Sequence, residues 1–260
     1  MTGADGFKRI VLGVSHRPFD DVAARVALAL AEDMRLDLLG YYPEDADVLA
    51  LGAMPFAREL RLLERGWTEI DATRLAAEAA LMAQRAERRF LEAVTASGAT
   101  PSFRVFQGSQ AEAIRSLSRA GDIVVISESS GPDPFATYTT QQLADVALGS
   151  EASVLLVPGR IARQRGSVVA LTARTNDASV EAAAFIADAT KSKLVIACIG
   201  ETRDDLQLLE AVRLASLNER LLVTARGLLE SSAASMLATR RRVPVLIAAE
   251  APLSAIETNS

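Results

Sequence analysis

The stretch Lys8-Arg9-Ile10-Val11-Leu12-Gly13-Val14-Ser15 decides the fold, because a similar stretch, Gly166-Ser167-Val168-Val169-Ala170-Leu171-Thr172, returns later in the chain. Each is a short, continuous apolar run that ends in a hydroxyl residue. Such runs are typical of parallel strands that are covered on both faces of a sheet. The repeat predicts two α/β halves, and it predicts that any ligand lies where the two runs end.

The match continues beyond the two stretches at the same spacing. An alanine-rich helical pattern follows both copies, and three positions of the first copy, Ser15, Arg17 and Asp20, correspond to Thr172, Arg174 and Asp177. The repeat therefore divides the chain into a complete domain over residues 1–160 and a shortened domain over residues 166–260. The polar and basic segment 160–166 is predicted to be the linker between them.

In the first half, strand patterns alternate with helical ones, which favours βαβ units and a parallel sheet. Two S/T-x-x-E/Q capping boxes predict helix starts, one at Ser109 with Glu112 and one at Thr139 with Gln142. Helices are also expected from about residue 22 to 34 and from 71 to 96. The second carries an apolar stripe at helical spacing, formed by Leu75, Ala79, Met82, Ala86, Phe90 and Ala93. Strands are expected over residues 10–14, 36–42, 103–106, 122–127 and 154–157.

A long segment separates the second strand of this half from its second helix. We expect a helical piece over residues 59–65. The apolar bulk of Met54-Pro55-Phe56 and Trp67 is expected to pack over the sheet; a lid or a subunit contact is the alternative. The acidic residues Glu44, Asp45 and Asp47 are expected in a solvated loop.

The second half repeats the alternation but is shorter. Strands are expected over residues 168–172, 194–199, 221–224 and 243–248, with helices over 178–190, 204–217 and 229–238. A half-Rossmann sheet has strand order 3-2-1-4-5, so its third strand lies at an edge. Losing that strand and its helix leaves a continuous 2-1-4-5 sheet, joined by a right-handed crossover.

Composition excludes several classes of protein. The 260 residues are 50% hydrophobic, and 28 basic against 33 acidic residues give a net charge of −5, which lacks the positive surplus of a nucleic-acid binder. No apolar run approaches a membrane span, and the polar N-terminus is no secretory signal. We therefore expect a cytoplasmic protein that binds neither nucleic acid nor membrane. The single cysteine, Cys198, is expected to be a buried strand residue.

The chain resembles the universal stress protein family. The resemblance rests on tandem α/β units of this length and on their strand endings, Asp122-Ile123-Val124-Val125-Ile126, Ala152-Ser153-Val154-Leu155-Leu156-Val157-Pro158 and Arg242-Val243-Pro244-Val245-Leu246-Ile247. It implies a fold of two half-Rossmann-like (adenine nucleotide alpha hydrolase-like) parallel sheets in tandem, the second lacking the edge strand–helix unit. It also implies a stress-linked binding or regulatory role, with a protein partner or a homodimer.

The nucleotide-binding members of that family carry an aspartate after the first strand. They carry Gly-x-x-Gly after the fourth strand and, nine residues later, Gly followed by Ser or Thr. This chain has Ser15 at the aspartate, Ser127 and Ser130 at the two glycines, and Thr140-Gln141 at the final pair. Glycine lets backbone N–H groups approach phosphates, so serine Cβ atoms obstruct that approach. We expect no ATP binding in the family manner and no cofactor; binding of ATP or AMP is the alternative.

Polar side chains at this edge remain candidates for contact with a ligand of another kind. The capped helix start at Thr139 is a plausible anion site. The candidates are Ser15, His16, Ser127, Ser130, Gly131, Thr139 and Thr140 in the first half, and Thr172, Thr224 and Gly227 in the second.

No catalytic site is expected. His16 is the one histidine, the chain has no Gly-x-Ser-x-Gly elbow and no Walker or Gly-x-Gly-x-x-Gly loop, and one His with one Cys cannot supply a typical zinc set. A solvated His16 is expected, and the alternative is a triad-like arrangement of His16 with Ser15 or Ser127 and with Asp20. An ATP-hydrolysing switch and a pure protein-interaction module remain the competing functions.

Overall fold

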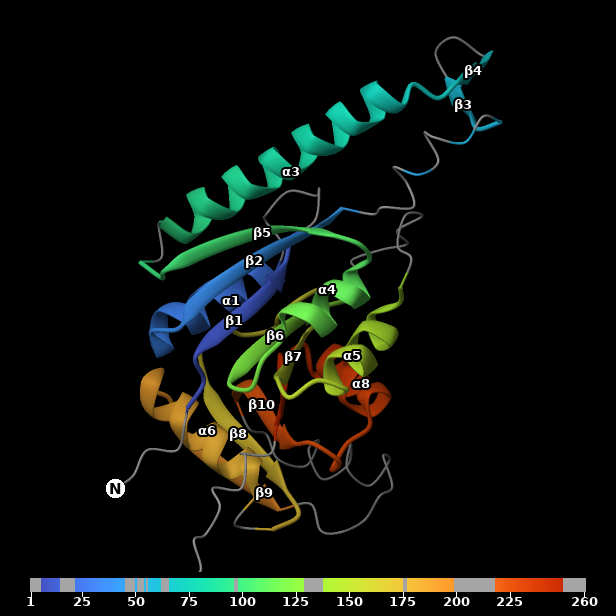
Figure 1. Ribbon diagram of the computed structural model, residues 1–260. Helices are drawn as coiled ribbons and strands as arrows, with labels where there is room; N and C mark the ends of the chain where they lie inside the picture. Colours follow the sequence, from blue (N-terminus) through green and yellow to red (C-terminus); the bar gives the residue numbers. More distant parts are fainter. Residues whose placement is uncertain are drawn as a thin grey trace, which may run out of the picture.

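A nine-stranded, mostly parallel sheet forms the centre of the molecule (Figure 1). The computed structural model describes residues 6–14, 22–44, 50, 54, 56–61, 66–95, 98–128, 138–174, 177–198 and 218–249. The strands of this sheet are β1 (Arg9–Gly13), β2 (Asp37–Glu44), β5 (Pro101–Gln107), β6 (Asp122–Ser127), β7 (Ser153–Val157), β8 (Ser167–Thr172), β9 (Leu194–Cys198), β10 (Glu219–Ala225) and β11 (Val245–Ala248).

The order of the strands is β5-β2-β1-β6-β7-β11-β10-β8-β9. Its first five strands have the predicted 3-2-1-4-5 order. Its last four strands, read from β9 inward to β11, have the predicted 2-1-4-5 order, which lacks a third strand. The predicted parallel α/β fold is confirmed. The two predicted sheets are continuous, because β7 pairs antiparallel with β11, with Val154 opposite Ile247 and Leu156 opposite Val245.

Helices cover both faces of the sheet. One apolar core packs under α1 (Val22–Met34), α3 (Ala72–Thr95) and α6 (Ala178–Ala189). A second core packs under α4 (Gln110–Leu117), α5 (Thr140–Leu148) and α8 (Ser231–Arg241). The central strands are buried on both faces, which explains why their sequences read as continuous apolar runs.

Both predicted capping boxes are present. Ser109 caps α4, because its hydroxyl accepts the backbone N–H of Glu112 while the Glu112 carboxylate accepts the Ser109 N–H at 2.8 Å. The Ser109 N–H and, at 2.9 Å, the Ser109 hydroxyl both donate to the Glu112 carboxylate, and they lower its pKa in that order of importance. Thr139 and Gln142 make the same reciprocal bonds at the start of α5.

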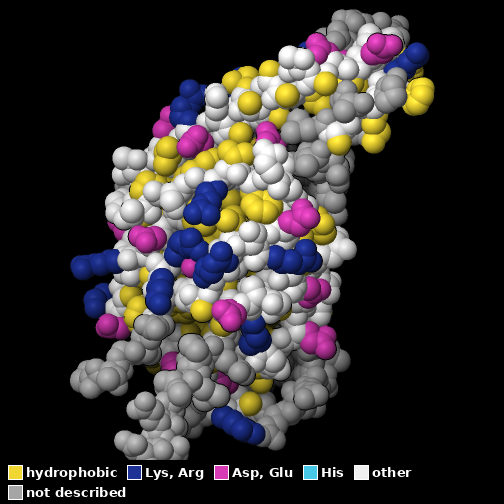
Figure 2. All heavy atoms as spheres, in the orientation of Figure 1, with side chains coloured by type: hydrophobic (Ala, Val, Ile, Leu, Met, Phe, Trp, Pro, Cys, Tyr) yellow, Lys and Arg dark blue, Asp and Glu magenta, His cyan; other side chains and the backbone are white. Residues whose placement is uncertain are grey.

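The segment before α3 differs from the prediction. The helix predicted over residues 59–65 is wrong for residues 59–61, which belong to β3 (Arg58–Arg61), and residues 62–65 lie outside the described residues. With β4 (Gly66–Glu69), β3 forms an antiparallel hairpin in which Leu60 is opposite Trp67. This hairpin and the first half of α3 project beyond the sheet as an arm (Figure 1). The expected packing of Phe56 and Trp67 over the sheet is wrong, because these side chains are 91% and 65% exposed. Yellow apolar side chains are visible along the arm in Figure 2.

The apolar stripe predicted on α3 is correct only toward its C-terminal end. Ala86 and Phe90 are buried, together with Ala83 and Val94, whereas the predicted Met82 is exposed. The helix reaches the sheet only with its second half, so most residues of its first turns are exposed.

Polar contacts join the two parts of the sheet beside β7 and β11. The Arg226 guanidinium donates to the carbonyl oxygens of Leu148 at 2.8 Å, Ser150 at 2.6 Å and Ala152 at 2.6 Å. Ser231 contacts Asp145 at 2.5 Å from helix to helix. One arginine thus satisfies three carbonyl groups at the C-terminal end of α5 and in the loop before β7.

The basic cluster Arg240-Arg241-Arg242 lies at the C-terminal end of α8, where cations complement the helix dipole, and Arg242 ends the helix in the left-handed region with φ 55°. Arg241 pairs at 2.5 Å with the buried carboxylate of Glu219. Cys198 departs from the prediction, because it is exposed on β9, the last strand of the sheet. The helix predicted over residues 204–217 lies outside the described residues. In the described ranges, no helix combines the length and apolar character needed to cross a membrane.

Candidate functional site

The carboxyl ends of the first-half strands bring some of the predicted residues together. Ser127 ends β6, and the Thr140 hydroxyl at the start of α5 donates to the Ser127 carbonyl oxygen at 3.4 Å. Thr139 is the N-cap residue of the same helix, and its hydroxyl is used by the capping box. The predicted residues Ser15, His16, Ser130 and Gly131, and with them Asp45 and Asp47, lie outside the described residues.

A buried tyrosine fills the space beside the end of β1. A Cβ atom added at Gly13 would lie 3.1 Å from the Tyr41 hydroxyl, and the Tyr41 side chain is buried in the core between the sheet and α4. Burial raises the pKa of this phenol well above its ordinary value. The phenol is therefore neutral over the physiological range, and its hydroxyl lies close to the backbone at the end of β1.

At the equivalent edge of the second half, the predicted threonines are fully buried. The Thr172 hydroxyl lies 2.9 Å from a carboxylate oxygen of Asp177, contacts the Arg174 carbonyl oxygen, and accepts the Arg174 N–H at 3.0 Å. Asp177 in turn caps α6 by accepting the Ser179 N–H at 2.6 Å. The repeated spacing of Thr172, Arg174 and Asp177 thus builds a closed loop of local hydrogen bonds.

Thr224 lies on β10, beside the end of β8, where it is paired with Leu171. Gly227 follows in a turn with φ +84°, a conformation that favours glycine. The structure therefore brings Thr172 and Thr224 to one edge of the sheet, as the repeat predicted, but neither side chain is accessible.

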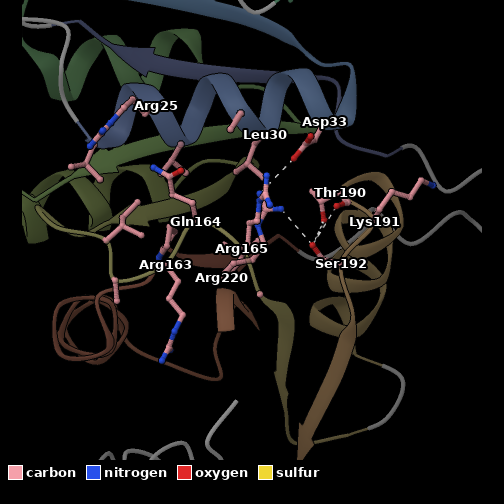
Figure 3. A pocket seen from close by; sticks show the side chains of 18 of the residues that line it. Arg25, Leu30, Asp33, Arg163, Gln164, Arg165, Thr190, Lys191, Ser192 and Arg220 are labelled. Carbon is pink, nitrogen blue, oxygen red and sulfur yellow. Dashed lines mark hydrogen bonds and ion pairs between the residues drawn. The ribbon is translucent and has the colours of Figure 1, made fainter. Parts of the chain in front are cut away.

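A groove of about 950 Å³ lies at the opposite edge of the second half. It forms where the amino ends of β8 to β11 meet α1 and the C-terminal end of α6, and the linker before Gly166 runs along it (Figure 3). The sequence interpretation missed this site, because its charged residues come from four segments that are distant in the chain. The basic character of the linker was the available signal.

Metal chemistry finds no support in the described part of the chain. There, no three His, Cys, Asp or Glu side chains gather in a way that holds a metal ion.

Solved structures with the same arrangement of strands and helices decide the fold. A universal stress protein from Archaeoglobus fulgidus DSM 4304 matches with TM-score 0.60 at 14% identity, over 94% of this chain and 97% of its own. The chain has the universal stress protein fold. A provisionally assigned universal stress protein from Pseudomonas aeruginosa UCBPP-PA14 matches with TM-score 0.54 at 13% identity, over 94% of each chain.

A functionally unknown protein from Pseudomonas aeruginosa PAO1 matches with TM-score 0.51 at 14% identity, over 94% of this chain and 93% of its own. No family model and no curated protein sequence matches the chain. The likeness to universal stress proteins therefore concerns the fold.

Proposed function

We infer that this protein is a binding and regulatory protein of the stress response that carries out no reaction of its own and does not hold ATP at the carboxyl edge of its sheet. One observation carries the proposal: two of the polar side chains at that edge are already bonded within the protein. Thr172 is bonded to Asp177 and Arg174, and Thr140 is bonded to Ser127.

Burial supports the same conclusion. A phosphate needs exposed donors, but Thr172 and Thr224 are inaccessible. Ser127 also adds a Cβ atom where the family pattern has glycine, and the Tyr41 ring lies beside the end of β1. A nucleotide at this edge would have to displace packed side chains or break existing hydrogen bonds, and both cost free energy.

Calorimetric titration with ATP and with AMP tests this proposal. We expect no saturable binding at the carboxyl edge with a Kd below about 100 μM. The matched variant is Thr140→Phe, which fills the space next to Ser127 without touching the opposite edge. Saturable nucleotide binding that disappears in Thr140→Phe would place the nucleotide at the carboxyl edge and overturn the proposal.

The projecting arm supports a role in protein contacts. Leu60 and Trp67 are cross-strand partners, and both are exposed, as is Phe56. Arg74 on α3 contacts Glu59 of the hairpin at 2.6 Å, and it also contacts Glu78 of its own helix at 2.7 Å. Exposed aromatic groups on a fixed support lose little conformational freedom on binding, and tryptophan is enriched at binding hot spots.

Sedimentation velocity tests whether the occupant of the arm is a second copy of this chain. We expect the wild-type protein to dimerise, and the double variant Phe56→Ser/Trp67→Ser to weaken dimerisation by about tenfold or more, because each loses a large apolar contact. Met236→Ser, an exposed apolar residue on α8, is the control and should leave dimerisation unchanged. A wild-type monomer, or equal dimerisation of all three proteins, would contradict the homodimer.

A further inference from the structure

The groove at the amino edge of the second half concentrates positive charge on an acidic protein. Its described lining carries six cationic side chains against one carboxylate, Asp33, although the whole chain has a net charge of −5. The cationic residues are Arg25, Arg163, Arg165, Lys191, Lys193 and Arg220. A cleft lined by one sign of charge focuses the field and attracts ions of the opposite sign.

These cations have few partners of their own. Arg220 makes two long contacts, 3.5 Å to Asp33 and 3.4 Å to the Ser192 hydroxyl. Within the described residues, Arg25, Arg165 and Lys193 form no ion pair. Lys191 points outward toward solvent (Figure 3) and lies 3.5 Å from Asp188. The remaining guanidinium and ammonium groups are therefore available to an anion.

The inner part of the groove is preorganised. The Arg220 side chain is 18% exposed and lies across the groove between Asp33 of α1 and Ser192 (Figure 3). The Thr190 hydroxyl donates to the carbonyl of Ile186 at 2.8 Å and lies 2.9 Å from the Ser192 hydroxyl. The Arg220 guanidinium carries more N–H donors than its two long contacts use, and a guanidinium can donate to two phosphate oxygens at once.

The groove also has an apolar wall. Val22, Val26 and Leu30 of α1 line one side, and Ile161 and Pro244 line other parts. Its volume of about 950 Å³ is within the range of small-molecule sites. A small anion of high charge, alone or attached to an apolar ring, fits this combination.

We propose that this groove binds a small ligand carrying two or more linked phosphate groups, with Arg25, Arg165, Lys193 and Arg220 contacting the phosphates. The site is separate from the carboxyl edge, since Gly166, Lys193 and Pro244 each immediately precede a strand, whereas Thr172 and Ser127 end strands. Binding here is therefore compatible with a carboxyl edge that is closed to nucleotides.

Calorimetry with inorganic tripolyphosphate and, separately, with ATP and GTP tests the site. We expect saturable binding that weakens as salt is raised, because exposed charges are screened. The double variant Arg25→Glu/Arg165→Glu should lose about tenfold or more in affinity, since two charge-assisted contacts are replaced by repulsion. Nucleotides that bind tighter than tripolyphosphate would indicate contact with the apolar wall; equal affinities would indicate phosphate recognition alone.

The control variant Arg85→Glu/Arg88→Glu reverses the same number of charges on exposed positions of α3, far from the groove. It should retain wild-type affinity, and so should Thr140→Phe at the carboxyl edge. Circular dichroism and thermal melting show whether each variant is folded. No saturable binding of any of the three probes by the wild-type protein below about 1 mM, or equal losses in both charge-reversal variants, would overturn the proposal.

Discussion

Phe90→Ala is expected to lower the free energy of unfolding by about 3–5 kcal/mol, the usual loss when a buried phenyl ring is removed. The Phe90 ring is fully buried, packs against Phe103 at 5.6 Å between ring centroids, and lies over Gly40, where an added Cβ would come within 2.7 Å of the ring. It is the largest of the four buried side chains that attach α3 to the sheet.

Urea denaturation of the wild type and the variant measures this effect. Leu81→Ala is the control, because Leu81 belongs to the same helix but is exposed on the arm; its stability should change by no more than about 0.5 kcal/mol. Equal losses in the two variants would mean that α3 is attached to the sheet in a different way.

Gly166→Ala is expected to destabilise the protein by about 3 kcal/mol, from roughly 1–3 kcal/mol of backbone strain and a similar amount of forced displacement. Gly166 has φ +151°, and an alanine Cβ would lie 2.1 Å from the Asn218 carbonyl oxygen. That carbonyl accepts the Ser167 N–H at 2.9 Å at the start of β8. Relief of the overlap must therefore shift the pairing of β8 with β10.

The matched control is Gly98→Ala. Gly98 also has a positive φ, +74°, but no atom lies within 4 Å of the added Cβ. Gly98→Ala should lower the free energy of unfolding only by the cost of backbone strain, about 1 kcal/mol. Thermal melting of both variants separates the two contributions; a Gly166→Ala midpoint no lower than that of Gly98→Ala would refute the steric account.

The strand order and the helix caps could be predicted because they depend on local patterns. Continuous apolar runs identify strands buried on both faces, and Ser109 and Thr139 with their partners three residues on identify helix starts. The burial of residues on the edge strand of the sheet, and on the part of α3 that extends beyond the sheet, could not be predicted from such patterns. Cys198 lies in an apolar run, but on the last strand, and Met82 continues an apolar stripe beyond the point where α3 meets the sheet.

For the candidate sites, too, local patterns predict the position of a residue in the sheet but do not predict its exposure to solvent. The repeat brought Thr172 and Thr224 to one edge because both follow from strand order. Accessibility depends on how the neighbouring groups pack, and no spacing in the chain reveals it. The cationic groove needed Arg25, Arg165 and Arg220 to converge from segments far apart in sequence, so a scan for runs of basic residues finds Arg240-Arg241-Arg242 instead.

The antiparallel pairing of β7 with β11 has a consequence for assembly. Both strands belong to one polypeptide, so their union does not lose the translational and rotational entropy that two separate subunits would lose. The tether keeps the partners at high local concentration however dilute the protein becomes. The nine-stranded sheet should therefore form completely in the monomer, and any dimer must use surfaces other than the β7–β11 pairing.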